Sequence, residues 1–234
     1  MEKKEFVIKD ITPGKLNALV RNIMEQVGTE DPDEAVRLVN SGKWKVTWAL
    51  EKELLLTTKT GIEVYDHGDR LRFKLPASTG KIGNEWINHF ENKNYVIGDH
   101  VYPVLRSKDF NPTNGVIHEV VILKGGIFVK GTSLSGENII SHIRDAANKC
   151  GFETPNPEIA CLIRDNFTNE EIGAMGDSFL VVMHEPIEDS FKWPYLLQVG
   201  ANHTKPLIFT TEKSNLYGSM VKYGFVFTVS QVQP

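Results

Sequence analysis

The chain of 234 residues has little cysteine and no long apolar run. Its two cysteines, Cys150 and Cys161, argue against both a disulfide framework and a cysteine-based zinc site. The richest apolar stretch, Phe179 to Met183, falls well short of the roughly 18 residues that a membrane span needs. No apolar stretch follows the charged N-terminus, so we expect no signal peptide and a cytoplasmic protein, with surface or virion display left open.

An excess of basic residues is also missing. Lysine and arginine number 26 against 30 acidic residues, which gives a formal net charge of −4 and argues against binding nucleic acid through net charge. The Walker and dinucleotide fingerprints are absent, and a hairpin turn explains Lys124-Gly125-Gly126 better than a phosphate loop does. We therefore expect no cofactor and no resident metal. The 41% hydrophobic and 24% charged content is typical of a globular chain.

The first third of the chain predicts a small module over residues 1–76. Thr12-Pro13 begins a helix with apolar residues at helical spacing, and Asp31-Pro32 begins a second helix that ends near Asn40. Alternating or β-rich stretches then predict short strands at 43–48, 54–58 and 71–75. A stretch rich in glycine, serine and threonine at 76–83 marks the predicted domain border.

Residues 77–234 mix helices and strands without a strict alternation. The patterns predict helices at 83–93, 99–107 and 137–150, a short capped helix after Thr168, and strands at 116–123, 159–163, 179–183 and 225–229. This order favours an α+β fold with a mixed, mostly antiparallel sheet. Residues 200–223 show no lasting period and are predicted to be irregular.

Two groups of residues suggest chemistry. His184-Glu185 follows a predicted strand and would suit a hydrolase or metal-dependent nuclease, with His118 as a further candidate. Adjacent strand residues point to opposite faces, however, so a solvated loop is the preferred interpretation of the pair. Cys161 lies among aliphatic residues and Cys150 at a core position of its helix, which favours structural roles, and a bridge between them stays open.

A basic and aromatic cluster near the N-terminus offers a third possibility. Trp44 and Trp48 with Lys43 and Lys45 would allow base stacking and phosphate contact. A strand at the edge of a sheet, protected by lysines, explains the same residues and is preferred. We therefore expect no nucleic-acid partner.

The region 200–223 is the remaining candidate for function. It mixes aromatic with short polar side chains, a composition found in adaptable binding loops. The alternative is a plain hairpin that pairs 207–211 with 217–221. The two interpretations carry equal weight on composition alone.

Several stretches, together with the N-terminal helical hairpin, carry a resemblance to a family of uncharacterised proteins from uncultured prokaryotes. The matching stretches are 107–116, 157–164, 182–187 and 223–232, within a resemblance that runs from about Gly83 to Val232. The segment before the final Gly224-Phe225 strand resembles the variable region of target proteins of diversity-generating retroelements. Such targets typically have a C-type-lectin-like fold, so the resemblance implies that fold for residues 77–234.

The resemblance implies a non-catalytic protein that recognises a protein or other macromolecule through a diversified C-terminal surface. Carried over by position, the ligand-binding residues would be Asn202, His203, Lys205, Phe209, Thr210, Thr211, Glu212, Lys213, Asn215, Tyr217, Ser219, Lys222 and Tyr223.

Overall fold

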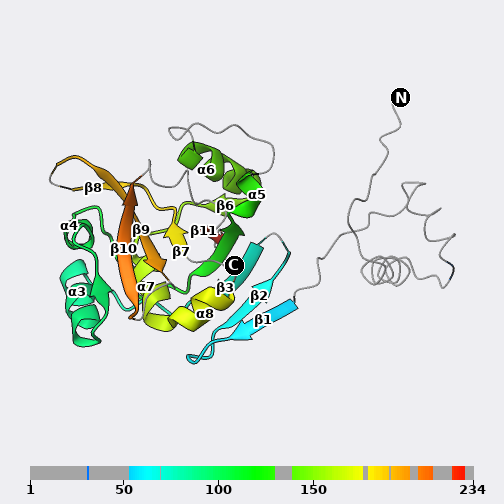
Figure 1. The fold of residues 1–234 in the computed structure, drawn as a ribbon, viewed down its shortest axis with the longest axis horizontal. Helices are drawn as coiled ribbons and strands as arrows, with labels where there is room; N and C mark the ends of the chain where they lie inside the picture. Colours follow the sequence, from blue (N-terminus) through cyan, green and yellow to red (C-terminus); the bar gives the residue numbers. More distant parts are fainter. Residues whose placement is uncertain are drawn as a thin grey trace. The chain divides into compact units, whose positions relative to one another are not determined.

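The computed structural model describes residues 31, 53–68, 70–129, 139–175, 179–189, 191–200, 205–212 and 223–229. The chain divides into two compact units, Met1–Leu50 and Glu51–Pro234, and the secondary structure described here belongs to the second. The predicted helical hairpin at 13–40 and the strand at 43–48, with its tryptophans, lie outside the described residues. The unit that begins at Glu51 is shown in Figure 1.

A large sheet forms the centre of this unit. Its strands are β1 Glu53–Thr57, β2 Glu63–Asp66, β3 Arg70–Lys74, β4 Val96–Ile97, β5 Glu119–Lys124, β6 Phe152–Glu153, β7 Phe179–Val182, β8 Ile187–Glu188, β9 Pro194–Gly200, β10 Leu207–Glu212 and β11 Tyr223–Val229. The main path runs β1-β2-β3-β5-β11-β7-β9-β10-β4, with β6 beside β11 and β8 beside β9. The pairs β11–β7 and β10–β4 are parallel and the other pairs are antiparallel. This confirms the predicted α+β class with a mostly antiparallel sheet.

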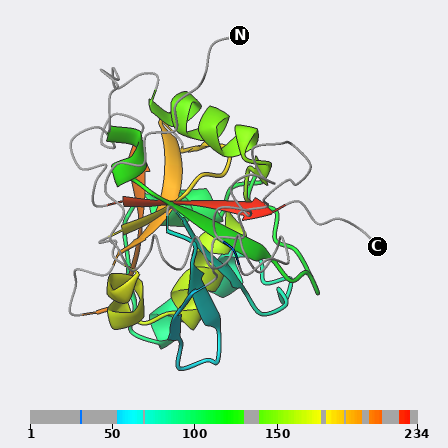
Figure 2. The same cartoon turned by 90° about the vertical axis from the view of Figure 1, so that its right-hand side faces the viewer.

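Helices cover both faces of the sheet, as Figure 2 shows. They are α3 Gly83–Asn92, α4 Val101–Leu105, α5 Gly126–Val129, α6 Ile139–Lys149, α7 Glu158–Asn166 and α8 Asn169–Ala174. Residues of α3, α4, α7 and α8 pack against one face and make the larger apolar core. On the other face α5 and α6 make a second core with the opposite side chains of β5, β7 and β11. Alternation along the strands thus supplies two separate cores.

The central helix α7 corrects a prediction, because residues 159–163 were expected to form a buried strand. A short apolar run cannot distinguish a buried strand from a buried helix. Asn156 Oδ1 accepts the main-chain N–H of Glu158, the first residue of the helix, at 2.8 Å, and the N-cap position itself is Pro157. Every residue from Glu158 to Arg164 is buried, including the charged Glu158 and Arg164, so the apolar run in this helix has no exposed face to separate it from a buried strand.

Two further predictions change in the structure. The region 200–223 was expected to be irregular, but Leu207–Glu212 forms β10, which pairs with β9 over its whole length. The domain border expected near residue 76 falls inside the sheet, because β3 pairs with β5 from Arg70↔Leu123 to Lys74↔Glu119. The break between compact units lies near residue 50 instead.

Candidate functional site

The strands β2 and β3 are joined by a tight turn at Gly68. Gly68 has φ +86°, a conformation that glycine adopts freely, and its N–H donates to Asp66 Oδ1 at 2.6 Å. Lys124 Nζ holds the other carboxylate oxygen of Asp66 at 3.0 Å. Partial burial raises the pKa of Asp66, but the bonds from Lys124 and Gly68 outweigh this and lower it below its usual value. The turn is therefore anchored to β5.

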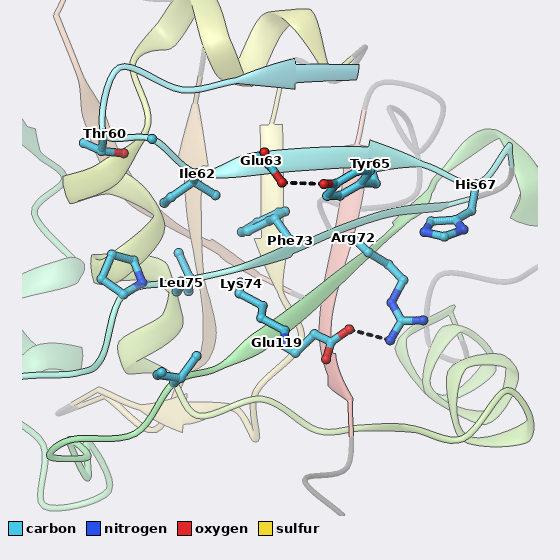
Figure 3. Close-up of a pocket in the computed structure, with 13 residues that line it drawn as sticks. Thr60, Ile62, Glu63, Tyr65, His67, Arg72, Phe73, Lys74, Leu75 and Glu119 are labelled. Atoms are coloured by element: carbon cyan, nitrogen blue, oxygen red, sulfur yellow. Dashed lines mark hydrogen bonds and ion pairs between the residues drawn. The ribbon is translucent and has the colours of Figure 1, made fainter. Parts of the chain in front are cut away.

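Pairing between β2 and β3 stops soon after the turn. Their register contains Asp66↔Leu71 and Tyr65↔Arg72 and goes no further along either strand. Both strands keep their outer partners, since β2 pairs with β1 from Thr57↔Glu63 and β3 pairs with β5 as far as Lys74. Figure 3 shows the two strands separating away from the turn. The sheet thus opens between two of its own strands.

A groove of about 690 Å³ occupies this opening, which we call the β2–β3 groove. Its lining residues are Thr60, Gly61, Ile62, Glu63, Tyr65, His67, Arg72, Phe73, Lys74, Leu75, Pro76, Ile117 and Glu119. Ile62, Phe73 and Leu75 are buried and belong to the larger core. Ile117, a large apolar side chain that is 55% exposed, also lines the groove. The volume lies within the range of about 300–1,000 Å³ that is usual for ligand sites.

Charged groups line the same groove. Arg72 donates to Glu119 Oε1 at 2.5 Å, and the Tyr65 hydroxyl donates to Glu63, a bond that raises the pKa of Tyr65. The side chain of Lys74 is exposed, and it forms no hydrogen bond or ion pair with the described residues. The groove therefore combines apolar walls with a basic side chain that is available to an anionic group.

The structure places the C-terminal residues implied by the resemblance in different settings. Lys205 is exposed and Thr210 is half-buried. Thr211 and Tyr223 are buried, and Phe209 is half-buried and packs edge to face on Phe179. Glu212 ends β10. The remaining residues lie outside the described part of the chain: Asn202, His203, Lys213, Asn215, Tyr217, Ser219 and Lys222.

Burial corrects the expectation for two of these residues. Thr211 is 4% exposed and Tyr223 is 8% exposed, so neither presents its side chain to a large ligand. Tyr223 instead packs against Phe179, with ring centroids 5.5 Å apart, in the second core. Tyr223 begins β11, a strand whose first five residues are all buried, and Thr211 lies in β10, which pairs with β9 over its whole length.

His184, the alternative catalytic candidate, is buried and held by main-chain hydrogen bonds. It is fully buried, its Nε2 accepts the Leu197 main-chain N–H at 2.9 Å, and its Nδ1 lies 2.6 Å from the Glu185 carbonyl oxygen. Both ring nitrogens are thus bonded to main chain, in the neutral tautomer that carries its proton on Nδ1. Burial lowers the pKa of His184 to about 4. Glu185 is exposed and pairs with Arg144.

A partly buried polar cluster surrounds Thr113. Its main-chain N–H and hydroxyl donate to Glu158 Oε2 at 2.7 and 2.9 Å. Thr113 Oγ1 also lies 2.9 Å from His118 Nε2 and 2.8 Å from Ser78 Oγ. Burial lowers the pKa of His118. The acid contacts the hydroxyl and not the second nitrogen of the histidine, so the order of a catalytic triad is absent from this described cluster.

The two cysteines are both free thiols. Cys161 is buried, as expected, and burial together with Glu158 and Asp165 raises its pKa. Cys150 is exposed, which corrects the core position expected from its helical spacing, because α6 ends at Lys149. Among the described residues, no three side chains of metal-binding type gather in one place.

The groove residues were missed by the sequence analysis. The alternation of Arg72 and Lys74 with Leu71 and Phe73 was the available signal, because it predicts one polar and one buried face for the strand. Nothing in the local pattern predicts that β2 and β3 separate.

Comparison with family models, curated proteins and solved structures yields no match to this chain. None of the described helices is long and apolar enough to cross a membrane. Function therefore has to be inferred from the geometry of the chain itself.

Proposed function

We propose that this protein is a non-catalytic binding module whose ligand occupies the β2–β3 groove. The observation that carries the proposal is the opening of the sheet between two strands that both keep their outer partners. A sheet that parts in this way leaves a cavity between rigid walls. Binding sites held on rigid elements lose little freedom when the ligand enters.

The chemistry of the lining supports binding better than catalysis. The apolar walls formed by Ile62, Phe73 and Leu75 favour the desolvation of an apolar group, while Lys74 and the Arg72–Glu119 pair supply polar contacts. A ligand in the groove would also cover the exposed apolar side chain of Ile117.

The display of a diversified surface by residues 202–223 on a C-type-lectin-like frame stays a prediction. Among the members of that set whose side-chain burial is described, Lys205 and Thr210 are neither buried nor packed on an aromatic ring. A reverse transcriptase gene beside a near-copy of the coding region for 200–223 would support it. An isolated gene without such a copy would contradict it.

Binding in the groove is tested with small amphipathic fragments screened against the full chain by saturation-transfer NMR. The variant Ile117→Arg places a long charged side chain at the groove. Its matched control is Ile82→Arg, because Ile82 is also 55% exposed and lies outside the groove. We expect fragments that bind the unmodified chain and Ile82→Arg but lose binding to Ile117→Arg.

Two results would overturn the proposal. One is a screen in which no fragment binds the unmodified chain. The other is a set of fragments that binds Ile117→Arg as well as it binds the control. Equal melting temperatures of the two variants would show that both have kept the fold.

A further inference from the structure

Main-chain hydrogen bonds show which residues face the opening between β2 and β3. In an antiparallel pair, the N–H and C=O of successive residues point alternately to one neighbour and to the other. Leu75 N–H donates to His118 O at 2.9 Å, so the main chain of Leu75 faces β5 and that of Lys74 faces β2. Both polar groups of Lys74 are therefore directed toward the groove.

The same reasoning applies to β2. His67 N–H donates to Arg70 O at 2.9 Å, which makes these residues a hydrogen-bonded pair. Every second pair along the register is of this kind, so the series continues through Tyr65↔Arg72. Its next member would join Glu63 to Lys74, and there the two strands no longer pair. Glu63 and Lys74 thus turn their main-chain groups toward each other across the groove.

From this geometry we infer that the ligand is an extended peptide segment that carries an acidic group. The inference rests on the proposed function of the groove. The peptide lies between β2 and β3 and completes the interrupted ladder with main-chain bonds to Glu63 on one side and Lys74 on the other. Addition of a peptide to an open ladder is an established mode of recognition, in which the backbone supplies affinity and the side chains supply selectivity.

The acidic group follows from the charges in the groove. Arg72 is paired with Glu119 and Glu63 accepts from Tyr65, whereas Lys74 has no described partner among these residues. Strand alternation places Glu63, Tyr65, Arg72 and Lys74 on the same face. A carboxylate on that face of the peptide would meet the Lys74 ammonium, while apolar groups meet Ile117 and the walls.

The test begins with a phage library of random nine-residue peptides, selected on the full chain. Peptides that bind are then synthesised with single N-methyl groups at successive positions, which remove one donor each and leave the side chains unchanged. We expect affinity to fall at least about fivefold at the few consecutive positions whose N–H groups face Glu63 or Lys74, and to change little at the other positions. Lys74→Met should weaken acidic peptides by about two- to fivefold, the effect of an exposed ion pair.

The outcomes distinguish failure of this inference from failure of the proposed function. Fragments that bind in the groove while no peptide is enriched would overturn the peptide inference and leave the binding role standing. Peptides that tolerate N-methylation at every position would also overturn it. Peptides that bind Ile117→Arg unchanged would contradict the location of the site. A Lys74→Met effect that persists when the acidic residue of the peptide is replaced by its amide would contradict the charge contact.

Discussion

The sheet is covered differently at β11 and at the β2–β3 end, which lies on the other side of β5. In β11, Phe225 packs in the core under α5 and α6 while its neighbour Val226 packs in the core under α3 and α7, and both are fully buried. At the β3 end, Phe73 is buried on one face but its neighbour Lys74 is exposed on the other. One sheet therefore has a strand buried on both faces and strands buried on only one.

This difference explains where a site can form. A strand covered on both faces has no freedom to part from its neighbour, because parting would expose apolar surface at about 25 cal/mol per Å². The strands β2 and β3 carry exposed or half-exposed polar side chains on their open face, so their separation beyond Tyr65↔Arg72 exposes much less apolar area. The groove lies where the helices stop covering the sheet.

The largest effect on stability is expected when a buried side chain is truncated in β11, the strand that is covered on both faces. Phe225→Ala removes a fully buried ring that contacts Phe128 edge to face, with ring centroids 5.7 Å apart. We expect a loss of about 3–5 kcal/mol in the free energy of unfolding, measured by urea denaturation. Lys74→Ala, the control at the open end, should change it by less than about 0.5 kcal/mol. Similar losses in the two variants would contradict the contrast.

Sequence patterns predicted many of the helices and strands in these regions. The alternation at 71–75 gave the strand β3, and the capping box Thr168-Asn169-Glu170-Glu171 gave the helix α8, where Thr168 accepts from Glu171 N–H. The closing strand and the helix α3 were predicted for the same reason. Periodicity is local information: β3 and α3 each have one buried and one more exposed face, and α8 has a clear cap.

The parts that failed depend on tertiary contacts. The helix α7 is buried from Glu158 to Arg164, so its short apolar run resembles that of a buried strand, and the Asn156 side chain that bonds its first N–H lies outside that run. The strand β10 consists of mixed polar and apolar residues and is fixed by β9 and β4 on either side. The β2–β3 groove depends on where pairing stops, and no residue type in either strand encodes that position.

A second prediction concerns how stability depends on pH through His184, which is buried just after β7. Burial lowers the pKa of His184 to about 4, below the value of about 6.5 expected in the unfolded chain. Below pH 6.5 the unfolded state therefore binds a proton that the folded state does not, and stability falls as pH falls toward 4. The full difference amounts to about 3 kcal/mol, with a slope of about 1.4 kcal/mol per pH unit near pH 5.

The measurement is urea denaturation at a series of pH values, with His184→Gln as the comparison variant. Glutamine has no titrating group, so the contribution of this site to the slope should disappear while the rest of the titration is retained. An unchanged slope in His184→Gln would show that the histidine is not responsible. The proposal for the groove is independent of this result.

A smaller effect is expected at the N-terminus of α7, where Glu158 binds Thr113 in the loop before β5. Glu158 is fully buried, and Glu158→Ala leaves the Thr113 N–H without its acceptor. Loss of a buried partner costs about 1–3 kcal/mol, again measured by denaturation. Glu158→Gln keeps an acceptor oxygen and should lose less. If the two variants were equally destabilised, the effect would come from the carboxylate charge that both remove, and neither the acceptor oxygen nor the packing of the side chain would explain it.

The smallest effect is expected at the open face, from the ion pair of Arg72 with Glu119. Each of these side chains is about one third exposed, at 35% and 34%. A double-mutant cycle with Arg72→Ala and Glu119→Ala should give a coupling energy of about 0.2–1 kcal/mol, reduced further by added salt. A coupling of several kcal/mol would mean that this pair is shielded from water. The groove face would then resemble the covered strands, and the difference between the two ends of the sheet would be lost.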